Sequence, residues 1–184
     1  MPVSWFHVPT PLPSGPVRVG ITADGVVSAN FGEVVAGEPD AVRPGDEAKV
    51  ALVMQRFAEY FTGTRRDFDL PVDWRRTAPG PQRTVLWTLH RTVGYGQTLA
   101  YGELAVRSGA FEAEIAAGQI GPAARNVGSI MGSNPLFLLV PCHRVVAADG
   151  IGGFGGGAVG MDVKRWLLTL EGVLPPTFDW NGPA

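Results

Sequence analysis

The stretch that decides the fold is LFLLVPCHRV, residues Leu136–Val145, and a glycine-rich segment at 150–160 follows it. A short apolar run that stops at a proline is typical of a buried strand, because proline cannot donate to the hydrogen-bond ladder. We therefore predict a strand over Leu136–Val140 that is ended by Pro141 and presents Cys142. Cys142 is the only cysteine in the 184 residues. The end of a buried strand is a suitable place for a nucleophile.

The residues near Cys142 favour a reactive thiol, although a free cysteine is more often a small buried hydrophobic residue. His143 is adjacent, and Glu171 ends a predicted helix four residues after the apolar Leu167. At that spacing Glu171 falls near the edge of the buried face, where a carboxylate needs a partner, and His143 is the candidate. A thiol with a pKa of about 8.5 is mostly protonated at neutral pH, so a base oriented by a carboxylate would activate it.

The composition is that of a folded protein with one large domain or two small ones, because 45% of its 184 residues are hydrophobic. A single cysteine excludes an internal disulfide, and His7, His90 and His143 are too scattered for a zinc site. We therefore expect a cytoplasmic protein with no metal and no cofactor. No apolar stretch approaches the roughly 18 residues of a membrane span, so no membrane partner is expected.

The N-terminal part combines β and α patterns. After a proline-rich arm, residues 17–21 and 26–31 flank Asp24-Gly25, which predicts a hairpin. A helix is expected to follow Asp46 as its cap and to end before Gly63. Residues 64–78 mix arginines and aspartates and are interpreted as a linker. Its arginine pairs are more typical of a solvated surface than of a phosphate site.

The C-terminal part has the pattern of a winged helix-turn-helix. One predicted helix carries apolar positions from Val85 to Val93, and a short one runs from Tyr101 to Gly109. A third helix, residues 122–131, would be the recognition helix. Between positions 80 and 172 there are seven Arg or Lys and six Asp or Glu. Any DNA contact should therefore use a local cationic face and be only modestly electrostatic.

One face of the helix over residues 122–131 carries a single long cation among small residues. Arg125, Gly128, Ser129 and Gly132 fall at i, i+3, i+4 and i+7. Such a face lets the helix approach another surface closely while one guanidinium projects into it. From the residues alone, that surface is either DNA or this protein's own N-terminal half.

The spaced motif Asn134-Pro135 and Pro141–Val145 resembles the active-site signature of the O6-alkylguanine-DNA alkyltransferases, also called methylated-DNA-protein-cysteine methyltransferases. The similarity extends from about Gly15 to about Leu174. It implies an α+β protein with a ribonuclease H-like N-terminal domain at 1–79, a winged-helix catalytic domain at 80–174, and a tail at 175–184. It also implies a monomer that binds double-stranded DNA in the minor groove.

The resemblance further implies DNA repair by alkyl transfer, in which a flipped base donates its alkyl group to the protein. Cys142 would take a methyl or other alkyl group irreversibly from O6-alkylguanine, and also from O4-alkylthymine, once per molecule. His143 would be the base, Glu171 its orienter, and Asn134 a support. In DNA binding, Arg125 would replace the flipped nucleotide, Tyr101 would push its phosphate, and Ser129 would lie on the same face. The substrate pocket would include Met131, Phe137, Val145, Phe154, Gly155 and Lys164.

Three positions depart from the family pattern. Phe154 stands where the family usually has a tyrosine that donates to guanine O6. The segment 108–121 is longer than usual by roughly ten residues, and Gly132 replaces a phosphate-contacting arginine of some relatives. Two other functions stay open: a lesion-binding protein without transfer, against which Cys142 argues, and a cysteine hydrolase. Adjacent Cys and His leave little room for the oxyanion geometry that a hydrolase needs.

Overall fold

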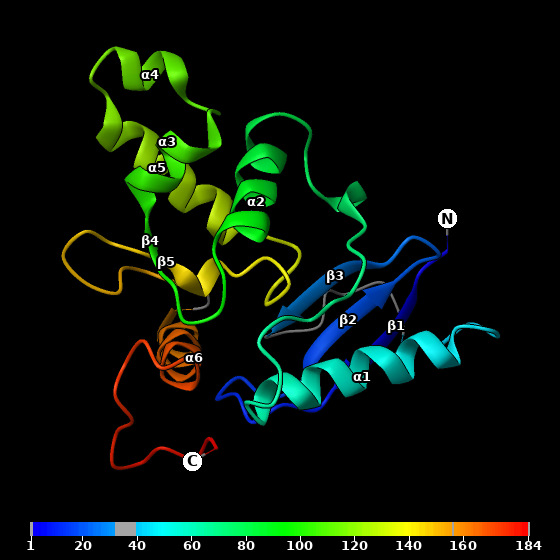
Figure 1. The fold of residues 1–184 in the computed structure, drawn as a ribbon. Helices are drawn as coiled ribbons and strands as arrows, with labels where there is room; N and C mark the ends of the chain where they lie inside the picture. Colours follow the sequence, from blue (N-terminus) through cyan, green and yellow to red (C-terminus); the bar gives the residue numbers. More distant parts are fainter. Residues whose placement is uncertain (1, 32–39, 156, 184) are drawn as a thin grey trace.

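The computed structural model describes residues 2–31, 40–155 and 157–183, and within them the protein is of the α+β class (Figure 1). The first part consists of β1 (Ser4–Val8), β2 (Val17–Ile21), β3 (Val26–Phe31), α1 (Glu47–Phe61) and the 3-10 turn η1 (Trp74–Arg76). The second consists of α2 (Pro81–Thr92), β4 (Leu99–Ala100), α3 (Tyr101–Ser108), α4 (Glu112–Ala116), α5 (Ile120–Gly132), η2 (Cys142–Arg144), β5 (Val145–Val146) and α6 (Gly157–Leu170). A small N-terminal sheet and a helical C-terminal part were predicted, and both are confirmed.

The N-terminal sheet is antiparallel in the order β1-β2-β3. The predicted hairpin is present, and the backbone amide of Thr22 donates to Gly25 O across its turn at 2.9 Å. The prediction of a proline-rich arm before the hairpin is wrong, because residues 4–8 form β1 and pair with β2. Prolines 2 and 9 flank this strand, so neither interrupts its ladder.

Helix α1 lies across one face of the sheet (Figure 1). Its buried side chains, Phe57 and Tyr60 among them, follow the helical spacing expected from the sequence. Asp46 stands at the predicted cap position, but its side chain makes no capping hydrogen bond. It accepts instead from Ser4 Oγ at 2.7 Å, which ties the start of α1 to β1.

The predicted strand over Leu136–Val140 is wrong, because this segment forms a tight turn. Leu138 has a φ of 72°, and the amide of Val140 donates to Leu136 O at 2.8 Å. The segment before the turn lies along the free edge of β3, where Ala29 N donates to Pro135 O and Phe137 N donates to Ala29 O. The apolar run is buried because both halves of the protein cover it, and burial alone does not distinguish a strand from a turn.

Residues 64–78 were predicted to be a linker, but they pack against the hairpin. Val26 N donates to Pro71 O, and Asp73 N donates to Val26 O, both at 2.8 Å. The charged side chains form the solvated surface that the composition favoured: Arg65 pairs with Glu59 at 2.6 Å.

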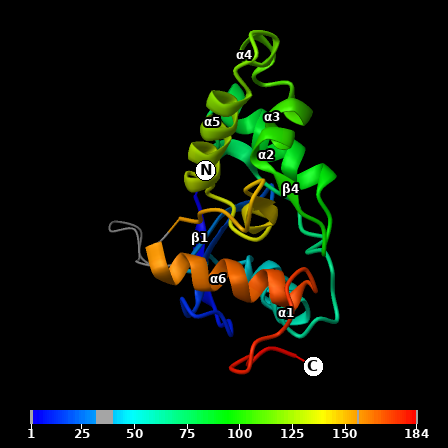
Figure 2. The same cartoon turned by 90° about the vertical axis from the view of Figure 1, so that its left-hand side faces the viewer.

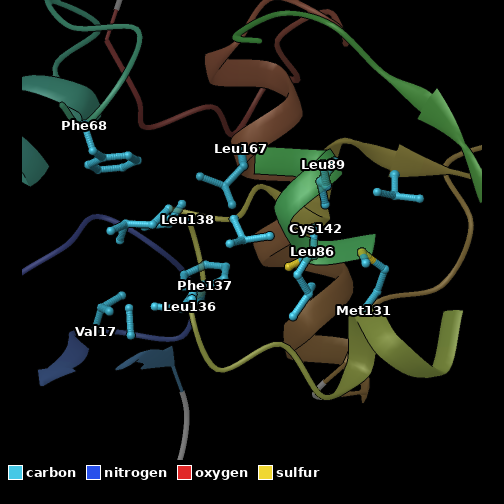
Figure 3. Close-up of a cluster of buried hydrophobic side chains, with 14 of the residues drawn as sticks. Val17, Phe68, Leu86, Leu89, Met131, Leu136, Phe137, Leu138, Cys142 and Leu167 are labelled. Atoms are coloured by element: carbon cyan, nitrogen blue, oxygen red, sulfur yellow. The ribbon is translucent and has the colours of Figure 1, made fainter. Parts of the chain in front are cut away.

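Side chains from both halves share one hydrophobic core (Figure 3). It includes Val17 of β2, Leu86 of α2, Leu136 of the turn before Cys142, and Leu167 of α6. The boundary near residue 79 therefore stays a prediction. In the longer segment 108–121, α4 lies at the end of the helical part far from α6 (Figures 1 and 2). The glycine-rich segment is shorter than predicted, because α6 already begins at Gly157.

Gly25→Ala is expected to destabilise the fold more than Gly15→Ala. Both glycines have a positive φ, 142° and 80°, and left-handed backbone costs other residues about 1–2 kcal/mol. A Cβ at Gly25 would also overlap the carbonyl oxygen of Pro71, whereas a Cβ at Gly15 would meet nothing within 4 Å. Urea denaturation of the two variants measures the difference. Equal losses would contradict the tight packing of residues 71–73 on the hairpin.

Candidate active site

Cys142 opens the turn η2 and is 5% exposed. Its amide donates to Val140 O at 2.8 Å, so the preceding turn fixes the backbone that carries the thiol. Burial raises the pKa of the Cys142 thiol above its ordinary value, against the opposing effects of a hydrogen bond with Asn134 and the cation of Lys164. The resting sulfur is therefore a neutral thiol at neutral pH, and it needs a base at the moment of attack.

His143 and Glu171 meet in the interior, as the helical spacing predicted. Nε2 of His143 lies 2.9 Å from Glu171 Oε1, and both side chains are fully buried. Burial lowers the pKa of His143, so its imidazole is neutral at neutral pH. Burial alone would raise the pKa of Glu171, but its pairing with His143 and Arg144 outweighs that effect and holds the pKa well below its usual range.

These charges determine the tautomer of His143. An ionised carboxylate can only accept, so Nε2 carries the hydrogen that is donated to Glu171. Nδ1 is then the imidazole atom with the free lone pair. It is buried and has no hydrogen-bond partner among the described residues. A buried acceptor of this kind is a suitable base for a proton released next to it.

Arg144 is a second partner of Glu171 that the sequence analysis did not identify. Its Nε and Nη2 atoms donate to the two carboxylate oxygens at 2.9 and 2.8 Å, and Nη1 donates to Val93 O at 2.8 Å. The fork geometry makes this a strong, directional pair. Arg144 lies in the quoted motif, so its position was visible in the sequence, but its partner was not.

Two further donors reach the same carboxylate from distant parts of the chain. Tyr60 of α1 donates its hydroxyl to Glu171 Oε1 at 2.6 Å, and Gly96 N donates to Oε2 at 3.2 Å. The sequence analysis predicted the helix that carries Tyr60 but not the role of this side chain. The one available signal was its hydroxyl on an otherwise apolar helix face, because a buried phenol needs a partner.

Asn134 and Lys164 hold the backbone around the thiol. Asn134 Nδ2 donates to Val140 O, and its Oδ1 accepts from Leu136 N, both at 3.0 Å. Asn134 thus braces a turn, where we had expected it to lead into a strand. Lys164 is fully buried and donates to Val145 O at 2.7 Å and to Gly153 O at 3.1 Å. Burial lowers the pKa of Lys164 to about 8.

A cavity of about 190 Å³ opens beside the thiol. Six of its nine lining residues were predicted as site residues: Met131, Asn134, Phe137, Cys142, Phe154 and Gly155. Asn30 and Phe31 of β3 also line it, and the sequence analysis missed both. Val145 and Lys164 were also predicted as pocket residues, but neither is among the residues that line this cavity.

A larger groove of about 690 Å³ runs along α5. It is lined by Tyr101, by Arg125, Gly128, Ser129 and Gly132 of the small-residue face, and by residues 152–155. Met131, Gly132, Phe154 and Gly155 line both the groove and the thiol cavity, so the two adjoin at these residues. The hydroxyl of Tyr101 donates to Gly153 O at 3.1 Å, next to the bond from Lys164.

The small-residue face of α5 does not pack against the N-terminal half. Arg125 and Ser129 are exposed, and Arg125 forms no ion pair with a carboxylate in the described part of the chain. Among the described residues, Arg125 is also the only charged one that lines the groove. The face is thus open to a partner, with one cation at its centre.

Other site types find little support within residues 2–31, 40–155 and 157–183. No group of three or more His, Cys, Asp or Glu side chains could hold a metal ion there. Among the helices of these ranges, none has the length and apolar character needed to cross a bilayer.

Comparison with known proteins gives consistent matches. Residues 81–173 match a family model described as 6-O-methylguanine DNA methyltransferase, DNA binding domain. A Thermus thermophilus protein named DNA base-flipping protein is 38% identical over 172 residues, which are 91% of this chain and 99% of that protein. A methylated-DNA-protein-cysteine methyltransferase of Mycolicibacterium paratuberculosis is 40% identical over 122 residues, 66% of this chain and 64% of that protein. The crystal structure of Mycobacterium tuberculosis OGT in complex with DNA superposes with a TM-score of 0.71 at 30% identity, covering 91% of this chain and 92% of that one.

Glu171→Gln is expected to destabilise the protein by about 3–5 kcal/mol, because it leaves Arg144 buried without a counter-charge. Glu59→Gln, the same change in the partly exposed pair with Arg65, should cost far less. The Glu171 contribution is present above the ordinary glutamate pKa of about 4.3 and is lost as the pH falls toward the lowered folded pKa. Denaturation at pH 7 and pH 3 tests this, and the loss caused by Glu171→Gln should be smaller at pH 3. Similar losses for both variants at pH 7 would contradict it.

Proposed function

The chain belongs to the 6-O-methylguanine DNA methyltransferase family, and on that premise we propose that it repairs DNA by moving an alkyl group from O6-alkylguanine to the sulfur of Cys142. The observation that carries this proposal is a lone thiol in a cavity that adjoins the groove along α5. The thiol and a neutral, carboxylate-held imidazole come from adjacent residues. O4-alkylthymine presents the same oxygen-bound alkyl group and is included as a substrate.

The proposed chemistry is a direct displacement at the alkyl carbon. The thiol proton passes to Nδ1 of His143, directly or through one water, while Glu171 stabilises the imidazolium that forms. The sulfur forms a bond to the alkyl carbon as the bond from that carbon to O6 breaks. Guanine leaves with the electron pair and takes up a proton. The product is a thioether that no base in the site can cleave, so each molecule acts once.

The groove along α5 is proposed as the DNA site, with α3 and α5 as a helix-turn-helix in the minor groove. An alkyl group on O6 lies inside the base stack, so the nucleotide must leave the stack to reach a cavity of this depth. Arg125, exposed and without an acidic partner, is suited to occupy the space that the base leaves. Tyr101 and Ser129 line the groove beside it. Because Arg125 is the one cation among the described residues that line the groove, long-range attraction to the DNA phosphates is weak. Binding then depends on the shape of the groove and on insertion of Arg125 into the base stack.

A second candidate function is lesion binding without transfer. The Thermus thermophilus relative is named for base flipping alone, and it aligns over nearly its whole length. Cys142 and the network behind it favour transfer, because a protein that only binds needs neither a thiol nor a base. We also propose that the protein acts as a monomer, because residues of one chain form the whole groove. Its proposed location is the cytoplasm.

Mixing the protein with a duplex that carries O6-methylguanine is expected to add the mass of one methylene to Cys142 and to restore guanine. Intact and peptide mass spectrometry of the protein, with nucleoside analysis of the DNA, measures both products. Binding without a mass change would favour the lesion-binding alternative. Repair of more guanines than protein molecules would contradict single use. Cys142→Ser is the control that retains the groove.

Arg125→Ala is expected to slow transfer from duplex DNA by roughly 10- to 100-fold, because holding a base out of the stack costs a few kcal/mol and each 1.36 kcal/mol is tenfold in rate. Reaction with the free base O6-methylguanine should change little, since no base needs replacing. Arg107→Ala removes an exposed cation of α3 that does not line the groove and serves as the matched control. Equal effects of the two variants on the duplex reaction would argue against insertion.

A further inference from the structure

We infer that Phe31, the last residue of β3, limits the size of the alkyl group that can reach Cys142. The inference rests on the proposed function, because it concerns the specificity of the same site. Phe31 belongs to the N-terminal sheet, whereas the thiol and its supporting network lie in the C-terminal half. The N-terminal half would then supply a wall of the reaction cavity in addition to its share of the core.

Three aromatic rings meet at this wall. Phe31 lies 4.5 Å from Phe137 between ring centroids, tilted by 57°, and 5.9 Å from Phe154 with an interplanar angle of 2°. All three line the cavity that also contains Cys142. Phe31 therefore stacks on the loop residue Phe154 and packs on the turn residue Phe137. Phe137 and Phe154 lie 6.4 Å apart, so the three rings form one aromatic cluster that lines the cavity.

The backbone around Phe31 is held firmly. Phe31 pairs with Val17 in the β2–β3 register, and two residues earlier Ala29 exchanges backbone hydrogen bonds of 2.8 and 2.9 Å with the segment 135–137. The free edge of β3 is thus fastened to the turn that positions Cys142. The strand that carries Phe31 and the turn that leads to Cys142 are therefore joined by backbone hydrogen bonds.

The volume of the cavity limits the size of the alkyl group that fits between the base and the ring of Phe31. An apolar cavity of roughly 150 Å³ holds one benzene ring. At about 190 Å³, the cavity beside Cys142 has room for a base edge with a small alkyl group. A benzyl group adds a second ring to be placed between the base and the wall. Packed interiors yield little to such an insertion, so the Phe31 ring must move or the larger group is excluded.

Phe31 is a better candidate for this role than its two neighbours. Phe137 is 3% exposed and lies within the turn, so its ring also supports the backbone before the thiol. Phe154 stands in the loop whose Gly153 carbonyl accepts from Lys164 and Tyr101. Phe31 is only partly buried, and its ring packs with Phe137 and Phe154, neither of which takes part in the hydrogen bonds between His143 and Glu171. Its size can change without altering the groups that activate the sulfur.

The test compares two duplexes of the same sequence, one with O6-methylguanine and one with O6-benzylguanine. Single-turnover rates of Cys142 alkylation are followed by intact mass spectrometry, and the benzyl-to-methyl rate ratio is the readout. Phe31→Ala is expected to raise this ratio roughly tenfold and Phe31→Trp to lower it, the scale of effect expected from one ring against a fixed wall. Phe6→Ala, in β1 and outside the cavity, is the matched control and should leave the ratio unchanged.

The outcomes separate the two proposals. If the unaltered chain alkylates Cys142 and the ratio follows the size of residue 31, the inference holds. If the unaltered chain reacts but the ratio is the same in folded Phe31→Ala and Phe31→Trp, the inference is overturned and the proposed function stands. Absence of any transfer by the unaltered chain would overturn the proposed function and this inference with it.

Discussion

The buried carboxylate of Glu171 is the interaction on which the rest of the structure depends. It accepts hydrogen bonds from Tyr60 of α1, Gly96 after α2, His143 and Arg144 of η2. A carboxylate in an apolar interior is very costly unless its lone pairs are all engaged, and here four residues from three segments of the chain donate to them. The same atoms therefore join the two halves of the fold and set the ionisation of the imidazole beside the thiol. Stability and reactivity cannot be varied independently at this residue.

A second constraint is that β3 is an edge strand of its sheet. An edge strand leaves unpaired backbone groups, and here residues 71–73 and 135–137 cover them. The second of these segments leads directly into the turn at Leu138 and then to Cys142. Covering the edge therefore positions the nucleophile against the N-terminal sheet. This connection explains why Asn30 and Phe31, more than a hundred residues before the thiol, line its cavity.

Charge is distributed unevenly between the interior and the groove along α5, the proposed DNA site. Arg144 and Lys164 are buried close to the thiol, while the groove along α5 contains one cation, Arg125. Arg144 stabilises the carboxylate of Glu171, and Lys164 lowers the cost of forming a thiolate at Cys142. The groove relies on small residues that permit close approach. An arrangement of this kind favours recognition by shape and by base extrusion over attraction to phosphate.

The sequence by itself determined the parts that depend on local patterns. Asp24-Gly25 between two β-prone runs predicted the hairpin, and helical spacing predicted α1, α2 and α5 and brought Glu171 to His143. Only the tertiary structure decided the contacts between residues far apart in the chain. Tyr60 and Glu171 are 111 positions apart, and nothing in either neighbourhood specifies the other. The run Leu136–Val140 is equally apolar as a strand or as a buried turn, and the free edge of β3 selected the turn. In the sequence Phe31 is an ordinary strand residue, and only the pairing at the edge of β3 places it beside the thiol.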